Sequence, residues 1–519
     1  MKHFALSLVF ISIMFLFLTL NCIIYTIKYK RQLNNEFENI TIYLESIQKV
    51  PDWFEVVARE IKDEKIKIGL VNIDDIPHEI HRKAEVVKVH FDPVGKQIQW
   101  SDLFPPWISK IPPPTCPNIP MPGFENYQEL DVIVANVSGC ESRDVSGLQV
   151  NLVVANLLVR SGRKDHNGAV FAVFIGSCEP MWEIFRCEDL VWHEGNSWVY
   201  KPELRRIKQK VLMPVGTCQH VPSFSQFGEE PYWGSQNQNN HLPQQREAYV
   251  TILHSTEDYV CGAITLAQSI IRSNSTKDLV LLADNNISPK SLNGLRAAGW
   301  KIKHIERIRS TFSRKKAYNR WNYSKFRIWQ LKEYDKVMFI DSDLIVKRNL
   351  DEFFIQPQLS AAGNCEKHFF NSGLMLIEPS ICTFDTLMKK RFVIESYNGG
   401  DQGFLNEMFS WWHRLPAEVN YLKVFVDFKD HVHQIPEDVY AIHYFGLKPW
   451  KCRVDYDCNW NWPDFREYAS NSAHERWLDV YYAMPEKLRQ YCPRTYEMDV
   501  KLQHSRHKGA NNSSSPNVL

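Results

Sequence analysis

The segment Lys336-Val337-Met338-Phe339-Ile340-Asp341-Ser342-Asp343 decides the fold, because an apolar run leads directly into two carboxylates. The run predicts a buried strand. Side chains at positions i and i+2 of an extended backbone point to the same side, so Asp341 and Asp343 are expected to converge. Two adjacent buried carboxylates repel each other, and a hard cation such as Mn²⁺ or Mg²⁺ removes that cost. A surface turn is the alternative, but it fits poorly because the apolar residues 344–346 follow.

The chain before this segment alternates between strand and helix patterns. Strands are expected at residues 249–253, 278–282 and 301–305, and helices at 259–272 and 288–298. This β-α-β-α-β order predicts a parallel sheet with helices on both faces. Ligands of such sheets bind at the carboxyl ends of the strands, where the strand order reverses.

A second segment, residues 438–448, offers further polar groups. A strand-like run ends in His443, and Lys448 follows five residues later. A neutral imidazole could supply a third metal ligand, and the ammonium group could bind a diphosphate. The alternative is an ordinary histidine at the end of a strand, and the spacing alone does not decide between the two.

A third segment, residues 397–406, combines glycines with the start of a helical pattern. The glycines allow close approach of the backbone, and Asp401 and Gln402 could bind the hydroxyl groups of a ligand. Equally, Asp401 could simply cap the helix that follows. The segment Asn371-Ser372-Gly373 is ambiguous in the same way.

A smaller α/β unit is expected earlier in the chain. Strand-like runs occur at residues 65–71, 131–135 and 169–175, with a helical pattern at 150–160. No catalytic group of residues is recognised in this unit. The predicted organisation of the whole chain is 1–3 cytosolic end, 4–27 transmembrane anchor, 28–64 stem, 65–222 N-terminal α/β domain, 223–245 linker, 246–462 main α/β domain, 463–500 C-terminal extension and 501–519 disordered tail.

Residues 4–27 form an uncharged, mainly apolar stretch. As a helix it would span a bilayer core of about 30 Å, whereas the apolar region of a cleaved signal peptide has only about 7–15 residues. A transmembrane anchor is therefore predicted. Lys28, Lys30 and Arg31 follow the stretch, and by the positive-inside tendency alone they would place the body of the chain in the cytosol.

Two features favour a lumenal body instead. Twelve cysteines permit disulfides in an oxidising compartment, and close pairs such as Cys178/Cys187 and Cys452/Cys458 lack the spacing of a zinc ribbon. The connectivity of these cysteines stays open. Sequons for N-glycosylation begin at Asn39, Asn136, Asn274, Asn286 and Asn322.

Composition excludes one class of partner and favours another. A net charge of +1 provides no field for nucleic acid or for an acidic surface, so no nucleic-acid partner is expected. Sixteen tryptophans are a high number for a chain of this length. Most such rings pack in cores, but sugar-binding proteins also use flat aromatic faces, so a carbohydrate partner gains weight.

Taken together and in this order, the motifs resemble glycosyltransferase family 8, the glycogenin-like group, from residue 246 to residue 458. The resemblance implies a GT-A, Rossmann-like α/β domain that uses Mn²⁺ and a UDP-sugar and retains the anomeric configuration. It implies that Asp341, Asp343 and His443 hold the metal ion. The residues that it places around the UDP-sugar are Leu253, Ser255, Tyr259, Asp341, Ser342, Asp343, Asn371, Ser372, Gly373, Asn398, Gly399, Gly400, Asp401, Gln402, His443, Tyr444, Phe445, Gly446, Leu447 and Lys448.

The resemblance also assigns roles within this set. Lys448 would reach the diphosphate. The residues expected to line the uridine site are Leu253, Ser255 and Tyr259. The residues expected to be catalytic are Lys325, Asp401 and Gln402, and Asn371 would lie beside them at the transferred sugar. No residue is an obvious carboxylate nucleophile. The family implies same-face attack with the leaving phosphate as the base, in which Asp401 or Gln402 could only assist.

The anchor, the additional N-terminal domain and residues 397–406 are similar to plant xylan glucuronosyltransferases. This similarity implies a Golgi membrane protein of type II with a lumenal catalytic domain, which overrides the charge bias around the anchor. It implies transfer of glucuronic acid from UDP-glucuronate to the 2-position of xylose in cell-wall xylan, and assembly as a homodimer or in a Golgi synthase complex. It does not identify the basic residue that meets the glucuronate carboxylate.

Two alternatives stay open. A glycogenin-like enzyme would transfer glucose and prime a glucan, but Asn398 stands where glycogenins often carry an acid, and the anchor also counts against it. A catalytically silent partner of a Golgi complex would be expected to lack Asp341, Asp343 or His443, and all three are present.

Overall fold

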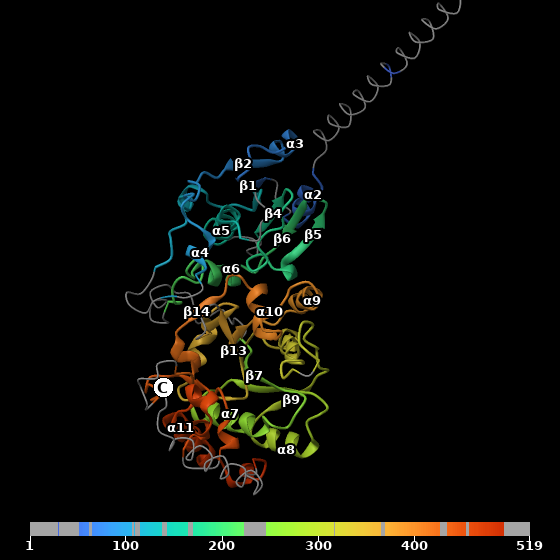
Figure 1. Ribbon diagram of the computed structural model, residues 1–519. Helices are drawn as coiled ribbons and strands as arrows, with labels where there is room; N and C mark the ends of the chain where they lie inside the picture. The colour runs from blue at the N-terminus through green and yellow to red at the C-terminus, as the bar shows by residue number, and fades with distance from the viewer. Residues whose placement is uncertain are drawn as a thin grey trace, which may run out of the picture.

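The computed structural model describes residues 28, 30, 51–61, 65–105, 108, 115–137, 143–163, 170–222, 245–315, 317–364, 369–425, 433–452 and 456–492. They form two α/β units, an N-terminal one in blue to green and a C-terminal one in yellow-green to red (Figure 1). Within these ranges no helix is both long and apolar enough to cross a membrane. The predicted anchor at 4–27 and the predicted tail at 501–519 lie outside the described residues, as does nearly all of the predicted linker.

The N-terminal unit is built on a six-stranded sheet in the order β2-β1-β3-β4-β6-β5. Its strands are β1 (Ile66–Val71), β2 (Ala84–Lys88), β3 (Val132–Ala135), β4 (Phe171–Ile175), β5 (Leu190–Glu194) and β6 (Ser197–Tyr200). The first four are parallel, and β6 and β5 add an antiparallel edge. Helix α5 (Val145–Arg160) is buried along most of its length on one face, and the Asp144 side chain caps it by accepting from the Ser146 and Gly147 amides.

Helix α2 (Asp52–Ile61) covers the other face of this sheet. Its residues Trp53, Phe54 and Val57 are spaced to share one helix face, and all three are buried against alternate residues of β1 and β3. The sequence analysis placed residues 28–64 in a stem. That boundary is wrong for α2, because its apolar face belongs to the core of the N-terminal unit.

The C-terminal unit has a seven-stranded sheet in the order β14-β12-β13-β10-β7-β8-β9. Its strands are β7 (Glu247–Leu253), β8 (Asp278–Ala283), β9 (Lys301–His304), β10 (Lys336–Ile340), β12 (Ser360–Gly363), β13 (Phe370–Ile377) and β14 (His413–Leu415). β10, β7, β8 and β9 are parallel, as expected, but β13 runs antiparallel to both β10 and β12. β12 and β13 follow each other directly without a crossover helix, which only an antiparallel pair allows. The sheet is therefore mixed.

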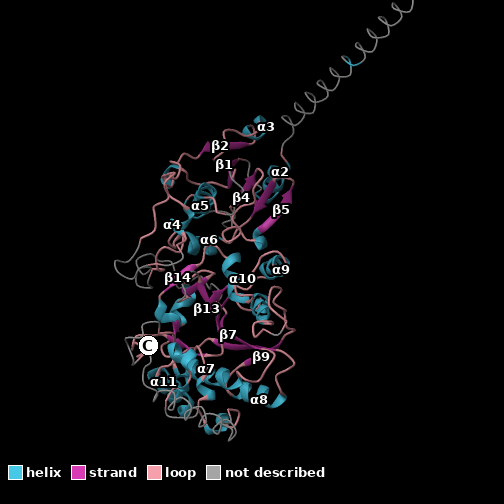
Figure 2. Ribbon diagram, in the orientation of Figure 1, coloured by secondary structure: helices cyan, strands magenta, loops and turns pink. Residues whose placement is uncertain are grey.

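Helices cover both faces of this sheet (Figure 2). One face packs against α7 (Val260–Arg272), α8 (Pro289–Ala297) and α11 (Asn471–Ala483). The other packs against the 3-10 helix η5 (Asn322–Gln330), α9 (Ile381–Lys390) and α10 (Asp401–Met408). Helix α11 and α12 (Glu486–Arg489) lie in the predicted C-terminal extension, yet they bury apolar side chains in the main core, and the disulfide Cys261–Cys492 ties them to α7.

The two units are joined by a covalent bond and by buried contacts. The disulfide Cys187–Cys382 crosses between them over 195 residues of sequence, so Cys187 does not pair with Cys178, whereas Cys452 and Cys458 do pair. In Figure 1, α6 (Leu204–Val211) lies beside β14. There Lys210 Nζ donates to the Trp411 carbonyl oxygen at 3.1 Å and lies 2.9 Å from His413 Nε2.

His413 makes the stability of this junction depend on pH. Burial, with Lys210 and Lys336 close by, lowers the pKa of His413 well below its usual value of 6.5. The unfolded chain takes up a proton as the pH falls through that value, and the folded chain does not. Stability is therefore fully present above about pH 6.5 and falls below it, by up to about 1.4 kcal/mol per pH unit. Urea unfolding is expected to show a shallower loss between about pH 7.5 and pH 5 in His413→Gln than in the wild type.

The exposed His304 supplies the matched control for this measurement. His304→Gln should keep the wild-type dependence on pH, because no buried imidazole is removed. Parallel curves for all three proteins would mean that His413 does not set the acid sensitivity.

Candidate active site

A cavity of about 730 Å³ opens where β7 and β10 end. Sixteen of the predicted site residues line it, and the structure thus brings together segments that are far apart in sequence. These residues are Leu253, Ser255, Tyr259, Lys325, Asp341, Ser342, Asp343, Asn371, Ser372, Gly373, Asn398, Asp401, Gln402, His443, Phe445 and Lys448. The predicted residues that do not line it are Gly399, Gly400, Tyr444, Gly446 and Leu447.

Backbone pairing brings His443 to the two aspartates. β11 (Leu344–Val346) starts directly after Asp343 and pairs antiparallel with β16 (Ala441–His443), with Leu344 opposite His443. The Tyr444 amide donates to the Asp343 carbonyl oxygen at 3.0 Å. As a result His443 Nε2 lies 3.3 Å from Asp343 Oδ1, and the ligand atoms of Asp341, Asp343 and His443 all lie within 4.8 Å of one another.

Without a bound cation, the surroundings shift the pKa values of Asp341 and Asp343 in opposite directions. Burial alone would raise the pKa of Asp343, but the Lys448 ammonium, 2.7 Å from Oδ2, and His443 hold it well below its usual range. Burial raises the pKa of Asp341, and the charge of Asp343 adds to this against the opposing effect of Lys325. Asp343 is thus held ionised, while burial opposes the ionisation of Asp341. A divalent cation would allow both to ionise.

The residues present fit such an ion. Two carboxylates and an imidazole form a donor set suited to a divalent metal. His443 Nδ1 is buried and has no hydrogen-bond partner in the described chain. The two other clusters of this kind found in the described residues contain Cys187/Cys382 and Cys452/Cys458, whose sulfurs are joined in disulfides. Asp341, Asp343 and His443 therefore form the metal-binding candidate of the described chain.

Gly373 on β13 makes room for the imidazole. A Cβ atom at this position would lie 2.4 Å from His443 Cε1 and 2.8 Å from its Nδ1. Gly373→Ala is therefore expected to displace the ring and reduce sugar transfer about 10- to 100-fold, as a lost supporting contact of a metal ligand does. Initial rates on variants with a native circular dichroism spectrum would check this.

Gly363→Ala on the neighbouring strand β12 is the matched control. Its Cβ would approach only the flexible end of Arg414, at 2.9 Å, so activity should stay near that of the wild type. Equal activity of both variants would show that the position of His443 does not depend on Gly373.

Asp401 and Lys325 form a buried ion pair beside the aspartates. Asp401 is the first residue of α10, and its Oδ2 lies 2.6 Å from Lys325 Nζ and accepts from Ser372 Oγ at 2.8 Å. Its Oδ1 accepts from Asn322 Nδ2 at 3.2 Å. Burial alone would raise the pKa of Asp401, but Lys325 lowers it, so the carboxylate is ionised. Since both oxygens are engaged, Asp401 is positioned as a binding group and not as a free nucleophile.

Gln402 and Asn371 are fixed by the same network. Gln402 Oε1 accepts from the Ser372 amide at 3.2 Å, and its Nε2 donates to Tyr397 Oη at 2.8 Å. Asn371 Oδ1 accepts from the Gly373 amide at 2.9 Å and from Asn420 Nδ2 at 3.0 Å. These contacts set the orientation of both amides at the cavity wall.

The predicted Ser255, just after β7, lies beside three residues that the sequence analysis missed, namely His254, Asp284 and Arg307. Ser255 adopts a φ of 71°, and its amide donates to Asp284 Oδ2 at 3.1 Å. Arg307 Nε lies 3.0 Å from the same oxygen. His254 lines the cavity, and burial lowers its pKa, so it is neutral. Asp284 follows a predicted strand as Asp341 does, which is the signal that could have found it.

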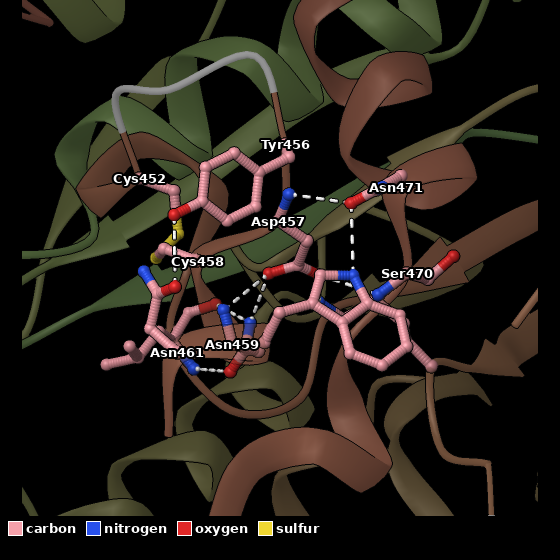
Figure 3. The surroundings of a disulfide bond; sticks show 11 residues. Cys452, Tyr456, Asp457, Cys458, Asn459, Asn461, Ser470 and Asn471 are labelled. Carbon is pink, nitrogen blue, oxygen red and sulfur yellow. Dashed lines mark hydrogen bonds and ion pairs between the residues drawn. A yellow bond between two sulfur atoms is a disulfide. The ribbon is translucent and has the colours of Figure 1, made fainter. Parts of the chain in front are cut away.

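The segment between His443 and Lys448 is held by Asn459. Figure 3 shows Asn459 beside the disulfide Cys452–Cys458. Asn459, next to Cys458, accepts from the Leu447 amide at 2.8 Å and donates to the Leu447 carbonyl oxygen at 3.0 Å. Gly446 has a φ of 72°, and a Cβ there would lie 2.3 Å from Asn459 Oδ1. Gly446 and Leu447 thus position the segment, and Tyr444 packs in the core with its hydroxyl donating to the Ala473 carbonyl oxygen at 2.7 Å.

Two family matches cover most of the described chain. Residues 41–218 match the GUX1-5 N-terminal domain, and residues 250–453 match Glycosyl transferase family 8. The UDP-glucuronate:xylan alpha-glucuronosyltransferase 2 of Arabidopsis thaliana is 46% identical over 86% of this chain and 78% of its own length. The chain belongs to glycosyltransferase family 8. It is a UDP-sugar glycosyltransferase with a GT-A-like α/β domain, and the family typically uses a divalent metal.

Further relatives of this family 8 enzyme match the chain over different lengths. The UDP-glucuronate:xylan alpha-glucuronosyltransferase 1 of Arabidopsis thaliana is 43% identical over 85% of the chain and 68% of its own length. Glycogenin-1 of Caenorhabditis elegans is 32% identical, but over only 33% of the chain and 41% of its own length. The N-terminal match begins at residue 41 and so includes α2, in agreement with the packing of that helix.

Proposed function

We propose that this enzyme transfers glucuronic acid from UDP-glucuronate to the 2-position of xylose in xylan, with Mn²⁺ and with retention of configuration. The observation that carries the proposal is the group Asp341, Asp343 and His443, with Lys448, in one cavity with Asp401. It lies in a chain whose relatives over most of its length bear the name UDP-glucuronate:xylan alpha-glucuronosyltransferase.

In this proposal the protein side chains bind and orient the donor. The ammonium group of Lys448 neutralises diphosphate charge, and Asp401, Asn371 and Gln402 bind sugar hydroxyls. A bound Mn²⁺ would supply Lewis-acid stabilisation of the leaving diphosphate. Asp401 has both oxygens engaged, so it is assigned no role as a nucleophile. In line with the resemblance to family 8, the xylose 2-hydroxyl attacks from the face of the leaving group. The new bond joins that oxygen to the anomeric carbon, the bond from carbon to phosphate oxygen breaks, and the hydroxyl proton passes to the phosphate.

The proposed location is the Golgi membrane, with residues 4–27 as the anchor of a type II protein and the two α/β units in the lumen. The disulfides Cys116–Cys218, Cys187–Cys382, Cys261–Cys492 and Cys452–Cys458 suit an oxidising compartment. Assembly as a homodimer or within a Golgi synthase complex belongs to the same proposal.

The test is a donor comparison with the full-length chain, produced in a secretory host and purified in detergent. UDP-glucuronate, UDP-glucose, UDP-galactose and UDP-xylose would each be offered with Mn²⁺ and xylo-oligosaccharides. Transfer from UDP-glucuronate supports the proposal. Transfer from UDP-glucose instead would indicate a glycogenin-like glucosyltransferase, and a folded protein that is inactive with every donor would indicate a silent partner.

A further inference from the structure

Two tyrosines stand at the mouth of the cavity with their rings in water. Tyr318 is 90% exposed and Tyr397 is 52% exposed, and both line the cavity. An exposed aromatic ring beside a polar cavity offers a flat apolar face, with a polar edge, to a ligand that enters the cavity. Tyr318 lies outside the motifs that resemble family 8, and Tyr397 stands at the first position of the segment 397–406. The proposed chemistry assigns no role to either ring.

The loops that carry these tyrosines are fastened to each other. Asn319, next to Tyr318, donates from Nδ2 to the Asn398 carbonyl oxygen at 2.6 Å, directly after Tyr397. Gly399 has a φ of 68°, and a Cβ atom there would lie 3.3 Å from the Phe312 carbonyl oxygen. The two loops therefore approach closely, and the tyrosines project from adjoining segments of one surface.

Tyr397 is also built into the network at the sugar end of the cavity. Its hydroxyl accepts from Gln402 Nε2 at 2.8 Å, and its ring stacks on Phe369 with 5.2 Å between the centroids. The ring is thus held in a fixed orientation next to Gln402 and Asp401. In the described chain, the Tyr318 side chain makes no hydrogen bond or ring contact, so its ring is available to a ligand.

We propose that Tyr318 and Tyr397 form an acceptor platform, on which the pyranose rings of a xylan chain stack beside the xylose that receives the sugar. The platform rests on the function proposed above. A pyranose presents a face of C–H groups that packs on an aromatic ring, while its hydroxyls stay in water. Xylose has no hydroxymethyl group, so the faces of its rings are unobstructed. An uncharged chain needs no ion pair, and two neutral rings match it.

The test compares acceptors of increasing length with the full-length enzyme. Tyr318→Ala is expected to raise the KM for xylohexaose about tenfold, because one ring contact of about 1.4 kcal/mol is lost. The KM for UDP-glucuronate should not change. Tyr318→Trp should restore the acceptor KM, and Tyr397→Phe should keep the stacking while losing the hydrogen bond to Gln402.

The matched control is Tyr482→Ala, which removes another exposed tyrosine, 56% accessible, on α11. An unchanged KM for xylohexaose in Tyr318→Ala, or a raised KM for UDP-glucuronate instead, would overturn the platform. Calorimetric titration with xylohexaose in the absence of donor measures binding of the acceptor alone. It therefore distinguishes failure of the platform from failure of the proposed function. Weaker binding by Tyr318→Ala than by the wild type would support the platform even if no glucuronate is transferred, and equal binding would overturn it.

Discussion

Asp343→Asn is expected to reduce sugar transfer by about 1,000-fold, which corresponds to about 4 kcal/mol of barrier. The asparagine keeps the size of the side chain but removes the charge that faces His443 at 3.3 Å and Lys448 at 2.7 Å. The proposed metal ion loses a ligand, and the partly buried ammonium loses its counter-ion. Asp343 is ionised over the whole working pH range because its pKa is held far below its usual value, so the defect should not be rescued at higher pH.

Two measurements would check this expectation. Initial rates with saturating donor give the loss of activity, and the rise in melting temperature on adding Mn²⁺ reports binding of the metal alone. The matched control is Asp385→Asn, because Asp385 is an exposed aspartate on α9 outside the cavity. If Asp343→Asn keeps more than about a tenth of the activity and the same response to Mn²⁺, Asp343 is not a metal ligand.

The local pattern of the C-terminal unit was sufficient to predict its parallel part. Residues 249–253, 278–282 and 301–305 form strands β7, β8 and β9 nearly as expected. Hydrophobic periodicity indicates which face of a helix or strand is buried, and these elements are long enough to show a clear period. The reversed strand β13 could not be predicted in this way, because an entirely buried strand has the same composition in either direction.

Long-range packing decides two further features of the fold. α11 buries Trp477 on the main core, although the sequence placed it in an extension. The cysteine connectivity was left open, and Cys187 pairs with Cys382, 195 residues away. In both cases the partner is set by contacts that only the folded chain brings together. The spacing of residues along the sequence does not predict these contacts.

In the candidate site, too, some residues could be identified from their spacing in the sequence, and others only from the folded structure. The pair Asp341 and Asp343 was identified from its spacing, but His443 could be added only through resemblance, since the pairing of β11 with β16 brings it near. Asn322 was counted as a glycosylation sequon, and the structure instead has its amide donating to Asp401 inside the cavity. His254 had no signal of its own, because a lone histidine after a strand is common in proteins.

Lys325→Met is expected to lower the free energy of unfolding by about 3–5 kcal/mol and to reduce transfer more than about 100-fold. Lys325 is 5% exposed, and its Nζ lies 2.6 Å from Asp401 Oδ2 and 3.5 Å from Asp341 Oδ1. Burial alone would lower the pKa of Lys325, but the two carboxylates raise it, so it carries its charge in the folded protein. Methionine fills a similar volume and leaves both acids without that charge.

A double variant separates the structural effect from the chemical one. Asp401→Asn added to Lys325→Met removes the uncompensated charge, so urea unfolding should recover most of the lost stability while transfer stays low. Lys325→Arg keeps the charge and should retain stability near that of the wild type. If the double variant is no more stable than Lys325→Met, the ion pair does not account for the destabilisation. If it regains transfer, the pair serves the fold and the cavity does not need Lys325 or the charge of Asp401 for the reaction.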